Sequence, residues 1–170
     1  MKQRIAPPQE LGLLAKLVIA FGIALIVAGV LWYGVAIETF KRIWHSLVDR
    51  PSGPVAFRFI LQPAMATIAA IYDGLKDART GRSPYFWTVL RKPHERAARL
   101  GEGLNATARI ILLGLAMDTI YQLIELEKFY PAEALIIALL LAFVPYLLLR
   151  GSVARIARRW RGAAYSHRIS

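Results

Sequence analysis

The sequence predicts an all-α integral membrane bundle of about four transmembrane helices with two amphipathic helices at the membrane interface. The chain has 170 residues, of which 56% are hydrophobic, and its mean hydropathy is +0.43. A soluble domain of this size is usually less apolar. The hydrophobic residues also cluster into blocks of about eighteen or more, the length that a helix needs to cross a bilayer. We therefore expect residues 1–170 to form a single membrane domain.

The net charge of +11 and the absence of cysteine narrow the possible functions. Lysine and arginine are concentrated beside the apolar blocks, where such residues orient helices and contact anionic lipid headgroups, so we expect lipid and no nucleic acid as a partner. Without cysteine, disulfides and thiolate metal sites are excluded. The histidines have no second ligand at helical spacing, and we predict no cofactor, metal site or catalytic residue.

The first apolar block, residues 17–37, contains no charged residue and predicts a retained transmembrane helix. A cleaved signal peptide would have a shorter apolar core, of about 7 to 15 residues. In residues 38–49 the hydrophobic side chains recur at helical spacing opposite charged ones. This pattern predicts an amphipathic helix at the membrane surface, with Trp44 among the lipid headgroups.

Residues 55–76 form the second predicted crossing, although Arg58, Gln62 and Asp73 share one side of this helix. Charged side chains near both helix ends can extend to the interface, which favours a full crossing over a re-entrant segment. A basic segment from residue 76 to residue 109 follows. Its aromatic cluster around Trp87 predicts an interfacial anchor, and residues 94–104 predict a short helix on the headgroups.

Residues 106–126 and 132–149 are the third and fourth predicted crossings, and the third again has polar residues on one side. Residues 152–161 then predict an amphipathic helix with a strongly basic face lying on the membrane. The residues expected to contact lipid headgroups are aromatic or basic and lie in the amphipathic or interfacial segments: Trp44, Trp87, Arg155, Arg158, Arg159, Trp160 and Arg161.

The polar sides of the second and third predicted crossings match in depth if these helices are antiparallel. An unpaired ion is costly in hydrocarbon, so we predict an intramembrane polar seam in which the two helices satisfy each other. Arg58 would pair with Glu125, and Gln62 would lie near Asp118. Asp73 would approach the basic segment. The predicted seam residues are Arg58, Gln62, Asp73, Asp118, Gln122 and Glu125.

The run Asp73-Gly74-Leu75-Lys76-Asp77-Ala78-Arg79 resembles the Asp-Gly-x-x-Ala-Arg core of the CDP-alcohol phosphatidyltransferases. That resemblance implies acidic residues that hold a divalent metal at the cytoplasmic end of membrane helices. In this chain the spacing is one residue longer, and Thr88 stands where the next glycine of the motif should be. A metal-dependent lipid-modifying enzyme is therefore only the third of our functional hypotheses.

The leading hypothesis is a non-enzymatic protein that acts by association, either as a homo-oligomer or as an accessory subunit of a larger membrane complex. The loops are too short for a soluble catalytic site. The second hypothesis is a small ion or proton channel or transporter that uses the polar seam, although one deep carboxylate without an inverted repeat is a weak transporter pattern. The basic loops predict an inner-membrane protein with both termini in the cytoplasm.

Overall fold

The computed structural model describes residues 10–34, 41, 57–83, 85–125 and 127–166, and this part of the chain is helical, without strands. The helices are α1 (Leu13–Tyr33), α3 (Arg58–Arg79), α4 (Tyr85–Arg91), α5 (Pro93–Glu125) and α6 (Pro131–Ser166). The all-α class is confirmed for these residues. The predicted amphipathic helix at residues 38–49 lies outside them, apart from Lys41.

Three helices are long and apolar enough to cross a membrane: Leu13–Tyr33, Pro93–Ile124 and Pro131–Trp160. The chain is therefore a membrane protein with an α-helical bundle. The second predicted crossing, α3, is not among the three, because charged residues occupy its first position and four of its last seven. That α3 crosses the membrane fully stays a prediction.

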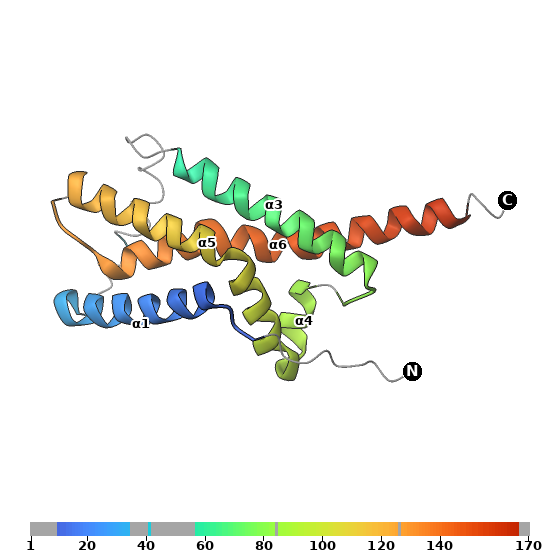
Figure 1. Ribbon diagram of the computed structural model, residues 1–170, viewed down its shortest axis with the longest axis horizontal. Coiled ribbons are helices and arrows are strands. Elements are labelled where there is room, and N and C mark those ends of the chain that lie inside the picture. Colours follow the sequence, from blue (N-terminus) through green and yellow to red (C-terminus); the bar gives the residue numbers. More distant parts are fainter. Residues whose placement is uncertain (1–9, 35–40, 42–56, 84, 126, 167–170) are drawn as a thin grey trace.

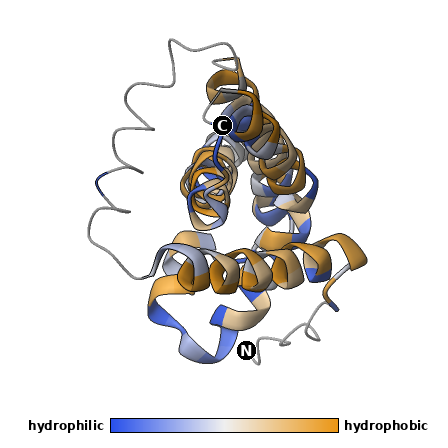
Figure 2. Ribbon diagram, turned by 90° about the vertical axis from the view of Figure 1, so that its left-hand side faces the viewer, coloured by the Kyte–Doolittle hydropathy of each residue, from blue (hydrophilic) through white to orange (hydrophobic). Residues whose placement is uncertain are grey.

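The helix α6 lies at the centre of the bundle, and α1, α3 and α5 each pack against it. The helices α1 and α5 run in one direction, whereas α3 and α6 run in the other (Figure 1). Hydrophobic residues cover much of the long helices, and hydrophilic residues gather around α4 and the beginning of α5 (Figure 2). Many large apolar side chains on the long helices are exposed, as expected of surfaces that face lipid.

Both ends of α1 are attached to the bundle by specific contacts. At its beginning, the backbone N–H of Gly12 donates to Asn105 Oδ1 over 2.8 Å, which satisfies one of the free donors of a helix N-terminus. At its end, the Tyr33 hydroxyl donates to the backbone carbonyl of Phe129 over 2.9 Å. Between these contacts, Gly29 allows close approach, because a Cβ there would lie 2.9 Å from the Ala132 Cβ.

Two pairs of segments that the sequence separates are joined in the structure. The predicted surface helix at residues 94–104 and the third crossing together form α5, which changes direction along its length (Figure 1). The fourth crossing and the amphipathic segment 152–161 together form α6. The helix continues through Gly151, although glycine is common at helix ends. The 36 residues of α6 span about 54 Å, compared with about 30 Å for the hydrocarbon core.

Gly74 provides a test of the packing between α3 and α6. A Cβ at this position would lie 2.8 Å from the Arg150 carbonyl oxygen and 2.9 Å from the Val153 Cβ. We expect Gly74→Ala to lower the free energy of unfolding by about 1–3 kcal/mol, because backbone and Cβ atoms cannot easily move aside. The measurement is the unfolding midpoint in detergent micelles, followed by circular dichroism.

Gly22→Ala is the matched control, since Gly22 also lies within a helix and its added Cβ would meet only the Leu135 side chain, at 3.6 Å. Here the better helix propensity of alanine should leave the stability unchanged or raise it by up to about 1 kcal/mol. Equal unfolding midpoints for the two variants would contradict the close packing of α3 on α6.

Candidate functional site

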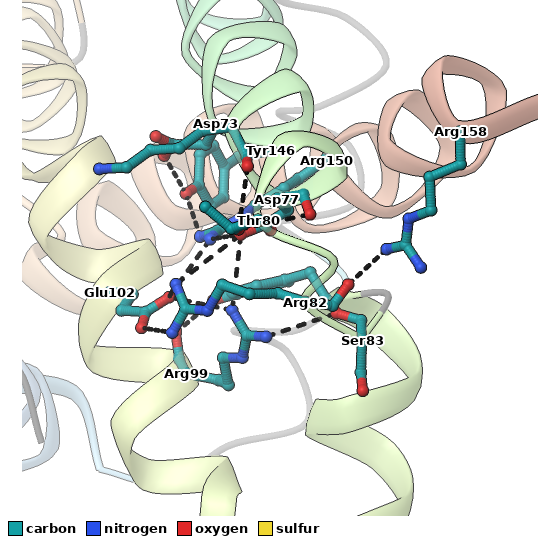
Figure 3. Close-up of polar contacts among 12 residues, drawn as sticks. Asp73, Asp77, Thr80, Arg82, Ser83, Arg99, Glu102, Tyr146, Arg150 and Arg158 are labelled. Atoms are coloured by element: carbon teal, nitrogen blue, oxygen red, sulfur yellow. Dashed lines mark hydrogen bonds and ion pairs between the residues drawn. The ribbon is translucent and has the colours of Figure 1, made fainter. Parts of the chain in front are cut away.

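Charged side chains from α3, α5, α6 and the segment after α3 meet at one end of the bundle (Figure 3). Asp77 and Arg150 form the middle of this cluster. Asp77 lies 19 residues after Arg58, the first residue of α3 (77 − 58), and Arg150 lies 19 residues after Pro131, the first residue of α6 (150 − 131). At 1.5 Å per residue this is about 28 Å, close to the thickness of the hydrocarbon core. Asp77 and Arg150 therefore lie at the same height along α3 and α6, about one hydrocarbon thickness from the beginnings of the two helices.

Asp77 and Arg150 form a buried, two-pronged ion pair between α3 and α6. Arg150 Nε lies 2.7 Å from Asp77 Oδ2, and Arg150 Nη2 lies 3.0 Å from Asp77 Oδ1. The two side chains are only 1% and 4% exposed. Charge-assisted bonds of this parallel kind are short and strong, and they fix the relative orientation of the two groups.

Glu102 on α5 is the second carboxylate of the cluster, and three guanidinium groups contact it. Arg82 Nη2 lies 2.7 Å from Oε1, while Arg99 Nη1 and Arg150 Nη2 each lie 3.2 Å from Oε2. Arg99 and Arg82 also lie within 3.8 Å and 3.7 Å of Asp77 Oδ1. Asp73 and Tyr146 also belong to this cluster, because they are hydrogen-bonded to each other and, through Tyr146, to Arg150. We call the whole set the ion network: Asp73, Asp77, Arg82, Arg99, Glu102, Tyr146 and Arg150.

Two buried tyrosines complete the surroundings of Arg150. Arg150 Nη1 donates to the Tyr146 hydroxyl over 2.7 Å, and that hydroxyl donates to Asp73 Oδ2 over 2.6 Å. The Arg150 guanidinium also lies 4.4 Å from the ring centroid of Tyr85 in α4. Burial raises the pKa of Tyr85 to about 12. Its hydroxyl therefore stays protonated and donates to the Arg99 carbonyl over 2.6 Å.

Helical spacing explains how the sequence brings these groups together. Asp73 and Asp77 lie one turn apart on α3, and Tyr146 and Arg150 lie one turn apart on α6, so each pair shares one helix face. Gly103 makes room for the Tyr85 hydroxyl, which would lie 2.3 Å from a Cβ at that position. The small residue is therefore needed where α4 packs on α5.

The geometry of the ion network favours a structural role over a chemical one. Its three guanidiniums and three carboxylates balance in formal charge, and Arg150 contacts both oxygens of Asp77. A carboxylate bound in this way offers no free oxygen pair to a divalent cation. Among the described residues, no group of three or more histidines, aspartates and glutamates could hold a metal ion.

The structure divides the predicted polar seam into separate parts. Gln62 is buried and its Nε2 donates to the Ile110 carbonyl over 3.3 Å. It occupies the space left by Gly114, where a Cβ would lie 1.9 Å from that nitrogen. Gln62 thus lies level with residues 110–114 instead of with Asp118. The side chains of Arg58 and Glu125 lie outside the described part of the chain, and their pairing stays a prediction.

Of the other seam residues, Asp118 and Gln122 bind each other within α5, whereas Asp73 contacts α6. Gln122 Nε2 donates to Asp118 Oδ2 over 2.7 Å, and Gln122 Oε1 accepts the backbone N–H of Tyr130 over 2.6 Å. Asp118 and Gln122 are both fully buried. Asp73 accepts a hydrogen bond from Tyr146, whereas Asp77 is the α3 carboxylate that approaches arginines of the basic segment. Our assignment of that role to Asp73 is corrected accordingly.

The predicted headgroup residues are distributed over two helices. Trp87 in α4 is 39% exposed, and Trp160 in α6 is 76% exposed. Arg155 and Arg159 are also exposed, but Arg158 is half-buried and donates to the Arg82 carbonyl. The side chains of Trp44 and Arg161 lie outside the described residues.

Sequence reasoning missed most of the ion network. The available signal was the repetition of polar residues one turn apart near the ends of two apolar helices, at 73 and 77 and again at 146 and 150. Glu102 and Arg99 were assigned to an interfacial segment, because the continuity of α5 was not visible in the hydrophobic pattern. Comparison with family models, curated proteins and solved structures yields no match.

Removing one partner of the central ion pair should strongly destabilise the bundle. Arg150→Gln leaves Asp77 buried without its two-pronged partner, and we expect the free energy of unfolding to fall by about 3 kcal/mol or more. Arg155→Gln, an exposed position on the same helix, serves as the control and should change it by about 0.5 kcal/mol or less. Thermal unfolding in micelles measures both. A small effect of Arg150→Gln would contradict the structural role of the pair.

Tyr85 should make the stability depend on pH in the alkaline range. Its pKa in the folded protein is about 12, above the ordinary value of 10.0. As the pH rises, the unfolded chain therefore loses this proton before the folded protein does. The contribution of Tyr85 to the stability of the folded protein is complete below pH 10 and is lost as the pH rises towards 12. In denaturant titrations, the difference in unfolding free energy between the parent and Tyr85→Phe should shrink over this range. A constant difference would contradict the raised pKa.

Proposed function

We propose that this protein acts by association: its membrane bundle presents the C-terminal half of α6 to a second protein. The observation that carries this proposal is the projection of α6 past the other long helices (Figure 1). On this projecting part, Ile156 is 55% exposed and Trp160 is 76% exposed. An unoccupied apolar pair on a helix that extends beyond the bundle is typical of an interaction surface.

The lengths of the helices support this interpretation. We place one boundary of the apolar layer at the ion network, because charged side chains are costly in hydrocarbon, so the residues after Arg150 would reach into the headgroup region and the adjoining water. At 1.5 Å per residue, the ten residues from Gly151 to Trp160 extend about 15 Å beyond that boundary. An apolar side chain at such a distance gains free energy when a partner covers it.

Packing also supports a fixed direction for the projecting helix. Close contacts of Gly74 with the Arg150 carbonyl and Val153 tie its base to α3. Ala154, one turn after Arg150, is fully buried. Arg158, a further turn along α6, donates to the Arg82 carbonyl. To lie flat on the membrane, as the sequence pattern predicts, residues 152–161 would have to break these contacts. A fixed projection offers a partner a preorganised surface.

The charge of the projecting helix favours a different protein over a second copy as the partner. Arg155 and Arg159 are exposed beside Ile156 and Trp160. Two copies of this surface would bring like charges together, which opposes association. A partner with an acidic, partly apolar face would complement it. The protein would then be an accessory subunit of a larger assembly in the inner membrane.

We further propose that the end of the bundle with the ion network faces the cytoplasm. The basic residues of the segment after α3 and of the projecting helix lie at this end, and such residues are enriched on the cytoplasmic side. The contact between Gly12 and Asn105 supports a beginning of α1 at the same end. Both termini would then be cytoplasmic.

Site-specific photo-crosslinking in native membranes tests this function. We expect probes at Ile156 and Trp160 to give crosslinks to one and the same protein. A probe at Ile68, which is 68% exposed on α3, is the control and should label lipid only. The Trp160→Ser change should reduce the protein crosslink from position 156 at least fivefold, because it removes apolar contact area.

Three results would overturn the proposal. If positions 156 and 160 label only lipid, the segment lies in the headgroups. If the product is a dimer of this chain, the partner is a second copy. If vesicles show proton or cation flux that Asp118→Asn abolishes without unfolding the protein, the bundle is a transporter, as in the second of our sequence-based hypotheses.

A further inference from the structure

A cleft of about 150 Å³ opens between α4 and α6, next to the ion network. Its walls have two different chemical characters. Phe86, Trp87 and Leu148 provide rings and aliphatic surface on one side, whereas Ser152 and Arg155 provide a hydroxyl and a guanidinium. Gly151 completes the lining. A ligand that fits this cleft should therefore be amphipathic.

Two guanidinium groups lie near the ring of Trp87, that of Arg155 in the lining of the cleft and that of Arg91 beside it. Arg91 lies 4.4 Å and Arg155 lies 5.6 Å from the centroid of its ring system. Neither arginine takes part in an ion pair among the described residues, unlike Arg82, Arg99 and Arg150 nearby. Two positive charges held near the same ring repel each other, and an anion bound beside them would offset that repulsion.

The position of the cleft connects it to both lipid tails and headgroups. Leu148 is 50% exposed at the end of the apolar part of α6, only two residues before Arg150. Trp87 is 39% exposed on α4, where an aromatic side chain at the boundary of the apolar layer is favourable. The apolar walls therefore adjoin the hydrocarbon, while the guanidiniums lie at the level of the headgroups.

We infer that this cleft is a specific site for an anionic phospholipid. The phosphodiester group contacts the Arg155 guanidinium and the Ser152 hydroxyl in the cleft, the charge of Arg91 near Trp87 adds to the attraction, and the beginning of an acyl chain follows Phe86 and Leu148. Arginine binds phosphate oxygens through several N–H groups at once. A zwitterionic lipid carries a headgroup cation that the two arginines repel, so the site selects lipids with a net negative charge.

This inference shares Arg155 with the proposed association but otherwise rests on different residues. The lipid site uses Trp87, Leu148 and Arg155, whereas the interaction surface proposed above consists mainly of Ile156 and Trp160. Successive residues are separated by about 100° around a helix, so positions 148 and 155 face a different direction from position 160. A failure of one proposal leaves the other testable.

Native mass spectrometry of the purified full chain, titrated with phosphatidylglycerol or phosphatidylcholine in detergent, tests the site. We expect Arg91→Gln with Arg155→Gln to weaken phosphatidylglycerol binding by about twentyfold, since each arginine near an anionic headgroup contributes about a factor of five. The matched control is Arg79→Gln with Arg109→Gln, which removes the same charge from two exposed arginines outside the cleft. That pair should change the affinity less than twofold.

A second variant keeps the test decisive if the double arginine change disturbs folding. Trp87→Leu leaves both charges in place but removes the ring against which they lie, and it should weaken phosphatidylglycerol binding about fivefold. Phosphatidylcholine should bind weakly to every variant. Equal affinity for the two lipids, or unchanged phosphatidylglycerol binding in the folded variants, would overturn the proposal. Displacement of phosphatidylglycerol by millimolar inorganic phosphate would show a free-phosphate site instead.

Discussion

The buried ion pair between Asp77 and Arg150 is the interaction on which the rest of the bundle depends. It joins α3 to α6 at the same height along both helices, with distances of 2.7 Å and 3.0 Å. Buried charges are costly unless each has a partner of opposite sign. The ion network meets this requirement through Glu102, Arg82 and Arg99, so that three guanidiniums surround the carboxylates of Asp77 and Glu102.

The position of the ion network also determines what the two ends of the bundle can do. At the far end, α1 is held by Tyr33 on the turn between α5 and α6. At the network end, the contacts of Gly74 and Arg158 fix α6 against α3 and the segment that follows it. The same contacts leave Trp160 and Arg155 outside the core. A bundle held in this way directs a basic, partly apolar helix away from its own centre.

Periodicity and composition were sufficient to predict the helical membrane class and the apolar blocks, but they were insufficient to predict the site. The seam prediction relied on matching depths along two antiparallel helices. Gln62 proved to lie level with residues 110–114, because Gly114 admits its side chain there. A register of this kind depends on where small residues allow close approach. It also depends on the continuation of α5 back to Pro93, which placed Arg99 and Glu102 beside Asp77.

The sequence alone determined that this is a helical membrane protein. The properties responsible are the order and length of the apolar segments, the excess of positive charge and the lack of cysteine. Tertiary packing decided which charged residues meet. Asp77 and Arg150 are separated by 73 positions, and no local pattern relates them. They meet because α3 and α6 run side by side in the same direction, with Gly74 allowing their backbones to approach. Because burying an unpaired charge is costly, Asp77 and Arg150 each need the other as a partner.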